Sequence, residues 1–147
     1  MPYWGGVRSK QINISKWQSF KVGKLFDGSN TGNVLVRDIE DGRGTIAYVT
    51  SSGVNNGVVA YIDANKYSII KGNCILVGGK TFTLTYQAKD FVSNDSHNIV
   101  IHLKSIHRNE YVYLYLISAI KAMLNKKYSA WKKINNYSNG FSWKYIC

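Results

Sequence analysis

The sequence predicts an α+β fold in a single domain, in which a twisted, mostly antiparallel and half-barrel-like sheet is packed by one main C-terminal helix and by short helices. Three observations predict it. The chain has 147 residues, which is the length of one domain. Apolar, β-branched runs separated by small polar residues fill the stretch from Gly44 to Gln87. Helical periodicity begins only later, at Asn109.

The N-terminal part is expected to lead into the sheet. Residues 1–11 are predicted to be a flexible lead, and residues 12–147 to form the domain. Asp27 to Asn33 has two glycines and no apolar residue, which predicts a loop, and Val34 to Ile39 predicts a short strand. The apolar residues before this loop are expected to anchor the core: Trp17, Phe20, Val22 and Leu25.

A β-hairpin is predicted in the middle of the chain. The runs Thr45 to Thr50 and Gly57 to Ile62 are joined at Asn56 and Gly57, two residue types that tolerate positive φ in a tight turn. The hairpin is expected to place these residues in the core: Tyr48, Val49, Val58, Tyr61 and Ile62.

Further strands are predicted after the hairpin. Cys74 to Gly78 is another β-type run, and Thr81 to Gln87 alternates in the manner of a half-buried strand. The polar composition of Phe91 to Asn98 predicts a loop. Ile99 to Leu103 predicts a strand that carries His102 on one face.

The segment from Asn109 to Lys127 has a helical pattern. Asn109 suits an N-cap, Glu110 suits the first turn, and Lys126 and Lys127 suit the last turn. One face is expected to cover the sheet, with Val112, Leu116, Ala119, Ile120 and Met123. Tyrosines at 111, 113 and 115 do not all fit this face, so part of the helix is expected to pack on two sides.

Charge is the strongest compositional signal. The chain has 19 Lys and Arg against 8 Asp and Glu, a formal net charge of +11. From Lys104 to Cys147 there are eight basic residues and one acidic residue, a difference of +7. Such an excess predicts attraction to polyanions, with nucleic acid as the first candidate. The alternative is a lysine-rich coding bias without functional meaning.

No motif for a metal or a cofactor is visible in the sequence. Cys74 and Cys147 have no CxxC or His-rich neighbour, so they are interpreted as a buried and a terminal thiol in the reducing cytoplasm. His97, His102 and His107 are spaced by five, which fits neither one strand face nor one helix face. Neither a metal site nor a cofactor is therefore predicted.

The sequence also disfavours a catalytic site and a membrane-spanning segment. The acidic loop around Asp38 and Glu40 lacks the further acid and lysine of a Mg²⁺-dependent nuclease. The run Gly78 to Thr81 lacks the first glycine of a phosphate-binding loop. Ser93, Asp95 and His97 are neighbours in one loop and rarely reach triad geometry from there. The longest apolar run, Tyr111 to Ile120, is too short to span a bilayer.

Short pieces along the chain match a known family in their order and spacing. They are Ile12 to Trp17, Phe20 to Phe26, Tyr48 to Ser51, Asn55 to Val58, Lys71 to Asn73 with Ile75 and Val77, Tyr86 and Gln87 with Phe91, and a helix followed by Lys126 to Trp131. Over residues 12–135 the chain resembles the target recognition domains of the specificity (S) subunits of type I restriction-modification systems, and more closely the related domains of BcgI-like restriction enzymes.

The resemblance implies sequence-specific binding of double-stranded DNA without catalysis. Because Asn, Ser and Thr can pair with base edges, we expect base reading by Ser51, Ser52, Asn55, Ser93, Asn94 and Asp95. Contacts to the DNA backbone are expected from Lys71, Lys80, Lys127, Lys132 and Lys133, with Trp131 beside them.

The implied partners are double-stranded DNA and, as further candidates, methyltransferase or restriction subunits or a second recognition domain. No pair of linking helices follows Trp131, which leaves an excised domain and a stand-alone domain both open. Two other functions stay open as well: a basic adaptor domain that binds protein, and a binder of single-stranded nucleic acid. A nuclease is the least favoured alternative.

Overall fold

The computed structural model describes Asn13 and residues 15–134, and it describes the backbone alone for Ala64 and residues 127–134. The predicted flexible lead, residues 1–11, lies outside the described residues. The elements in chain order are α1 (Val22–Leu25), β1 (Phe26–Asn30), η1 (Val36–Asp38), β2 (Ile46–Val49), η2 (Val54–Gly57), β3 (Val58–Ile62), η3 (Ala64–Lys66), β4 (Cys74–Val77), β5 (Leu84–Gln87), β6 (Phe91–Ser93), β7 (Ile99–Leu103) and α2 (Glu110–Ile134).

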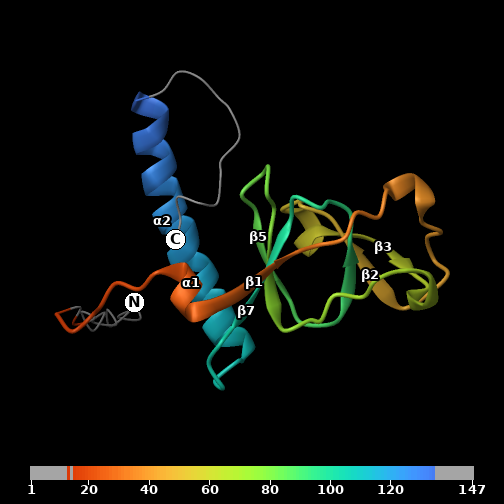
Figure 1. Cartoon of the computed structure of the whole chain (residues 1–147), viewed down its shortest axis with the longest axis horizontal. Coiled ribbons are helices and arrows are strands. Elements are labelled where there is room, and N and C mark those ends of the chain that lie inside the picture. The colour runs from red at the N-terminus through yellow and green to blue at the C-terminus, as the bar shows by residue number, and fades with distance from the viewer. Residues whose placement is uncertain (1–12, 14, 135–147) are drawn as a thin grey trace, which may run out of the picture.

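The domain is layered, as Figure 1 shows from left to right. Helix α2 packs on a four-stranded sheet of order β1-β7-β4-β5, and a three-stranded sheet of order β3-β2-β6 lies on the other side. All strand pairs are antiparallel except β2 and β6, which run parallel. The predicted α+β fold, with a mostly antiparallel sheet and one main C-terminal helix, is confirmed.

The position of strand β4 between α2 and the second sheet explains why its sequence is apolar throughout. Ile75 and Val77 face α2 and pack with Tyr113 and other residues of the helix. Cys74 and Leu76 face the second sheet and pack with Val49, Phe91 and Val100. All four residues of β4 are therefore buried, and alternation disappears in a strand that is covered on both faces.

The predicted hairpin is confirmed as β2 and β3, with Ile46 opposite Ile62. Its connection is longer than a two-residue turn, since the backbone N–H of Thr50 donates to the carbonyl of Gly57 at 2.8 Å and η2 lies between them. Asn55, Asn56 and Gly57 all have positive φ. Tyr48, Val49 and Ile62 are buried as predicted, but Tyr61 is 52% exposed, because it alternates with Ile62 along β3.

Two predictions near the N-terminus are wrong. Part of the predicted loop from Asp27 to Asn33 is strand β1, since pairing with β7 satisfies its backbone although its side chains are polar. The predicted strand from Val34 to Ile39 is irregular and contains η1. Its carbonyls accept hydrogen bonds from tyrosines, with Tyr48 donating to Val34 at 2.6 Å and Tyr67 donating to Asp38 at 2.7 Å.

The predicted core anchors divide into two groups. Val22 and Leu25 pack against the buried cluster under α2, as expected. Trp17 and Phe20 are 60% and 61% exposed, so their assignment to the core is wrong. The short helix α1 begins only at Val22.

Two later boundaries also differ from the prediction. Strand β5 begins at Leu84 rather than Thr81, and it is buried on both faces, with Thr85 and Gln87 inside. The predicted loop from Phe91 to Asn98 begins with strand β6, whose three residues are all buried. The predicted strand from Ile99 to Leu103 is confirmed as β7.

Helix α2 is confirmed and longer than predicted. The side-chain oxygen of Asn109 accepts a hydrogen bond from the N–H of Val112 at 3.0 Å, as an N-cap does. Tyr113 and Ile117 are buried against the sheet, whereas Ala119 is exposed, so the predicted face is rotated slightly. The helix continues to Ile134, so Lys126 and Lys127 are not in its last turn.

Candidate nucleic-acid interface

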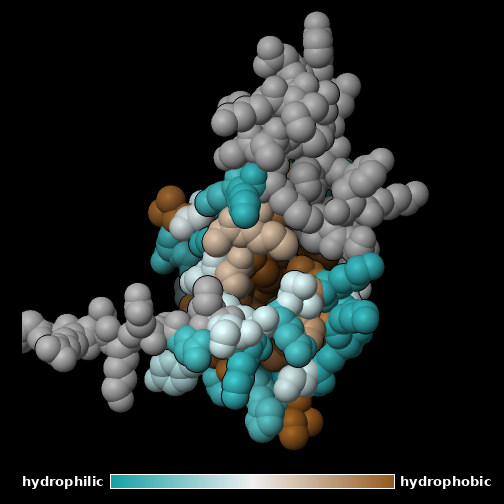
Figure 2. Space-filling view, turned by 90° about the vertical axis from the view of Figure 1, so that its left-hand side faces the viewer, coloured by the Kyte–Doolittle hydropathy of each residue, from teal (hydrophilic) through white to brown (hydrophobic). Residues whose placement is uncertain are grey.

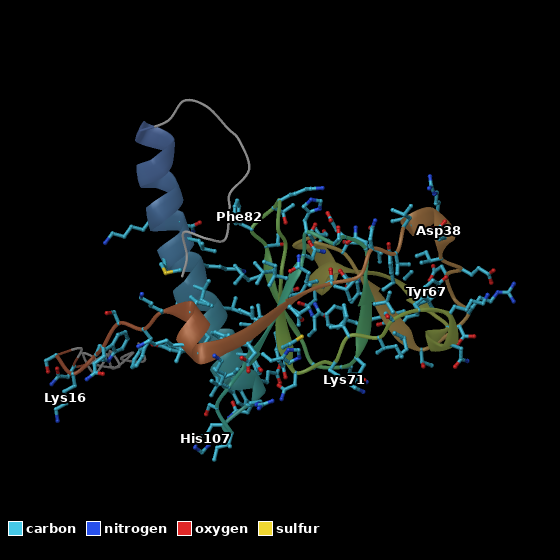
Figure 3. All side chains as sticks on the ribbon, in the orientation of Figure 1. Lys16, Asp38, Tyr67, Lys71, Phe82 and His107 are labelled. Carbon is cyan, nitrogen blue, oxygen red and sulfur yellow. The ribbon has the colours of Figure 1, made fainter. Side chains whose placement is uncertain are left out.

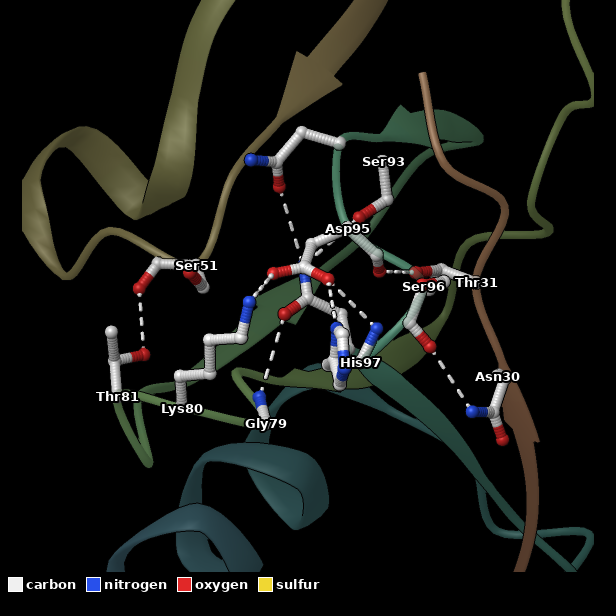
Figure 4. A network of polar contacts seen from close by, with 12 residues as sticks. Asn30, Thr31, Ser51, Gly79, Lys80, Thr81, Ser93, Asp95, Ser96 and His97 are labelled. Atoms are coloured by element: carbon white, nitrogen blue, oxygen red, sulfur yellow. Dashed lines mark hydrogen bonds and ion pairs between the residues drawn. The ribbon is translucent and has the colours of Figure 1, made fainter. Parts of the chain in front are cut away.

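Three loops meet at one end of the molecule. Because β2 and β6 are parallel neighbours, the loops that follow them emerge together, and the turn between β4 and β5 lies beside them (Figure 4). The hydroxyls of Thr81 and Thr83 donate hydrogen bonds to the carbonyl of Ser51, at 3.0 and 2.7 Å. We call this surface the loop end; it comprises residues 30–31, 51–55, 78–83 and 94–98.

Asp95 holds two of these loops together (Figure 4). Its Oδ1 accepts hydrogen bonds from the backbone N–H of His97 at 2.8 Å and from Nδ1 of the same ring at 2.7 Å. Its Oδ2 lies 3.5 Å from the ammonium of Lys80. The backbone hydrogen bond from His97 lowers the pKa of the Asp95 carboxyl, and the His97 ring and Lys80 lower it further against the opposing effect of burial.

The end of β1 joins the same network. The hydroxyl of Thr31 donates a hydrogen bond to the carbonyl of Asp95, and the amide of Asn30 donates to the carbonyl of Ser96 at 3.1 Å. The buried side chain of Asn98 donates to Ser93 and Asn94. Segments that are distant in the sequence are thus fixed against one another by polar contacts.

Close backbone approach requires glycine at Gly79. A Cβ at this position would lie 2.0 Å from the carbonyl oxygen of His97, which no side chain can occupy. The N–H of Gly79 also donates to the side chain of Asn98 at 3.4 Å. The turn after β4 therefore packs directly on the loop after β6.

The described cations lie mostly away from the loop end. Among the described side chains, Lys80 is the one Lys or Arg within the loop end. Lys71, Lys104 and Arg108 lie in connections at the opposite end of the strands. Figure 3 shows this separation, with Phe82 at the upper end and Lys71 and His107 at the lower end. Helix α2 rises past the sheet on the upper side in Figure 1, and its last turns are rich in lysine.

An apolar cavity of about 270 Å³ lies between α2 and the four-stranded sheet. Figure 2 shows hydrophobic side chains in the hollow on this face. The residues around it include Val22, Phe26, Val77, Ile101 and Leu124. Such an apolar lining offers little to a polyanion.

The family of the chain follows from comparison with known proteins. The family model described as "Type I restriction modification DNA specificity domain" matches residues 14–138. The chain belongs to this family. Among curated proteins, none matches the sequence.

A solved structure supports the fold of this specificity domain. The chain is similar to the crystal structure of a type I restriction-modification system S subunit from M. genitalium, with a TM-score of 0.56 and 18% sequence identity. The match covers 80% of this chain and 29% of that S subunit. The specificity domain described here therefore spans less than a third of the length of the protein that it resembles.

The specificity domain places most of its predicted base-reading residues at the loop end. Ser51 and Ser52 are half-buried beside the β4–β5 turn, and Asn55 is exposed in η2. Asn94 is half-buried in the loop after β6. Asp95 lies there too, with its carboxylate already engaged by Lys80 and His97.

Ser93 does not face outward. It is 1% exposed, and its hydroxyl accepts a hydrogen bond from Asn98 at 3.2 Å. A base edge cannot reach a side chain in this position, so we exclude Ser93 from the interface. The cause is the assignment of Phe91 to Asn98 as a loop, since Ser93 is the last residue of strand β6.

The residues predicted to contact the DNA backbone do not share one surface. Lys71 precedes β4 and pairs with Asp90 at 2.8 Å, whereas Lys80 follows β4 and pairs with Asp95. The two lysines therefore lie at opposite ends of the strand. Lys127, Trp131, Lys132 and Lys133 belong to the last turns of α2, where the side chains lie outside the described residues.

The place of several residues in the loop end was not predicted from the sequence. Asn30 and Thr31 belong to one predicted loop, and His97 and Asn98 belong to another. Nothing in the local sequence distinguishes them, because their partners come from other strands.

The acidic loop that was compared with a nuclease site forms ion pairs with neighbouring basic residues. Glu40 lies 3.9 Å from both Arg43 and Lys66, so the acidic loop is a set of exposed ion pairs. No group of three or more His, Cys, Asp or Glu side chains able to hold a metal occurs in the part of the chain that the structure describes. Burial raises the pKa of the Cys74 thiol to about 12.

Within the residues that the structure describes, no helix has the length and hydropathy needed to cross a bilayer.

Proposed function

We propose that this specificity domain binds double-stranded DNA in a sequence-specific manner through its loop end and performs no catalysis of its own. The observation that carries the proposal is the convergence of cross-linked loops on one polar surface, in a chain that belongs to a DNA specificity family. Direct reading of a duplex needs hydrogen-bonding groups held in fixed positions, and these contacts supply that rigidity.

The available side chains suit base edges. Ser52, Asn55 and Asn94 carry hydroxyl and carboxamide groups at the loop end, and Asn and Ser are among the residues that pair with bases in the major groove. Lys80, together with lysines of α2 such as Lys126, would contact phosphates. The formal net charge of +11 would supply the non-specific part of the affinity.

In this proposal the domain is the recognition part of a larger restriction-modification assembly in the cytoplasm. Methyltransferase or restriction subunits, or a second recognition domain, would be its protein partners. The adaptor alternative predicts DNA binding that is sensitive to salt but blind to sequence. A single-strand binder would present aromatic faces, whereas the described loop end is mainly Ser, Thr and Asn.

The test is selection from a pool of randomised duplexes at physiological salt, followed by sequencing of the retained DNA. The proposal predicts enrichment of a short, non-palindromic block and a preference for the duplex over either single strand. Retention without enrichment would overturn it and would favour the adaptor alternative. Preference for unpaired oligonucleotides would favour the single-strand binder.

A further inference from the structure

His97 is held at the loop end through its backbone and through one ring nitrogen. Its backbone carbonyl packs against Gly79, and its N–H and Nδ1 both donate to Oδ1 of Asp95. Its side chain is nevertheless 65% exposed. The ring is therefore oriented by the hydrogen bond at Nδ1 and presents its remaining edge to solvent.

The contact with Asp95 fixes the tautomer of the ring. An ionised carboxylate has no proton to donate, so the proton of this hydrogen bond must be on Nδ1. In the neutral ring, Nε2 then has a lone pair and no proton. Within the residues that the structure describes, Nε2 of His97 has no hydrogen-bond partner. His97 thus displays a single, oriented hydrogen-bond acceptor at the centre of the loop end.

We propose that Nε2 of His97 reads one base pair by accepting a hydrogen bond from an exocyclic amino group in the major groove. There the amino groups of adenine and cytosine are donors, whereas thymine and guanine present acceptors through their oxygen atoms. An oriented acceptor accordingly selects adenine or cytosine on one strand and rejects thymine and guanine at the same position. This inference rests on the proposed function and adds to it a specificity-determining residue.

Asp95 is a positioning residue in this scheme. Its carboxylate does not touch the base but sets which ring nitrogen carries the proton. Replacement of Asp95 by asparagine removes the negative charge that holds the proton on Nδ1. The proton can then move to Nε2, which would turn the outward acceptor into a donor suited to guanine or thymine.

The experiment repeats the duplex selection at pH 8 with wild-type protein and with three variants. Asparagine keeps a donor close to the place of Nδ1 and has no group at the place of Nε2. His97→Asn is therefore expected to keep the enriched block but to lose discrimination at one position, by roughly fivefold to a hundredfold. Asp95→Asn is expected to shift that same position towards guanine or thymine.

The matched control is His107→Asn, the same substitution at an exposed histidine at the opposite end of the molecule (Figure 3). It is expected to leave the whole block unchanged. Circular dichroism shows whether each variant folds, and if His97→Asn does not fold, Asp95→Asn decides the question alone.

The two proposals fail in different ways. A wild-type block that His97→Asn and Asp95→Asn both reproduce at every position would overturn the role of His97 and leave the proposed function standing. Absence of any enriched block with wild-type protein would overturn the proposed function, and the role of His97 with it.

Discussion

Lys80 and Asp95 form an ion pair, with a distance of 3.5 Å between nitrogen and oxygen, that ties the turn after β4 to the loop after β6. The two residues are separated by strands β5 and β6 in the sequence. Their contact joins the two connections in one surface. Rigid loops lose less conformational entropy on binding, and a recognition surface gains affinity from this preorganisation.

The close approach of Gly79 to His97 predicts a strong effect of a single methyl group. In Gly79→Ala the new Cβ would overlap the carbonyl of His97, so the two loops must separate. We expect a loss of about 1–3 kcal/mol in the free energy of unfolding, as for other overpacked sites. Urea denaturation measures it. Gly32→Ala is the control, since no atom lies within 4 Å of a Cβ there, and an equal loss in both variants would contradict the account.

The opposite positions of Lys80 and Lys71 predict different effects on DNA binding. If DNA contacts the loop end, Lys80→Ala should weaken binding and reduce the slope of log affinity against log salt by about 1. Lys71→Ala removes the same charge at the other end of β4 and should leave that slope nearly unchanged. Fluorescence anisotropy at several salt concentrations measures both. A larger effect from Lys71→Ala would place the DNA on the opposite end.

The buried hydroxyl of Tyr113 predicts a stability effect unconnected with DNA. The hydroxyl accepts a hydrogen bond from the backbone N–H of Leu103 at 3.1 Å. This bond connects α2 to β7. Tyr113→Phe leaves that buried N–H without a partner, at a cost of about 1–3 kcal/mol. Tyr111→Phe on the outer side of the helix, where the side chain is 81% exposed, should cost little. Thermal melts of both variants make the comparison.

Asp90 predicts part of the acid sensitivity of the domain. Its carboxylate accepts hydrogen bonds from Lys71 and from the N–H of Gly72, and these lower its pKa from the ordinary value of 3.8. Its stabilising contribution is therefore complete above that value and is lost as the pH falls through the lower folded pKa. Melting temperatures measured from neutral pH down to acid should fall less steeply for Asp90→Asn than for wild type. Identical acid profiles would contradict this.

The sequence is sufficient to predict those elements whose pattern is local. Helix α2 has its N-cap at Asn109, and the hairpin of β2 and β3 has positive φ at Asn56 and Gly57, as their residue types require. Strand β1 could not be predicted, because its polar residues are held only by pairing with β7. Trp17 and Phe20 show the reverse case, in which apolar character alone does not place a residue in the core.

The candidate site was predictable only in part for the same reason. Ser51 and Ser52 follow the first strand of the predicted hairpin, so their position at one end could be inferred from the sequence. The burial of Ser93 and the pairing of Asp95 with Lys80 depend on how β6 lies beside β2. The family resemblance suggested DNA recognition, and the fold brings together the surface that we propose for it.

The most direct test of this account is hydrogen–deuterium exchange of the protein with and without a duplex that carries the selected block. The account predicts slower exchange at residues 51–55, 79–83 and 94–98 when DNA is bound. It predicts little change at residues 71–73, 88–90 and 104–109 at the opposite end. Protection confined to these latter segments would contradict the assignment of the loop end as the DNA-reading surface.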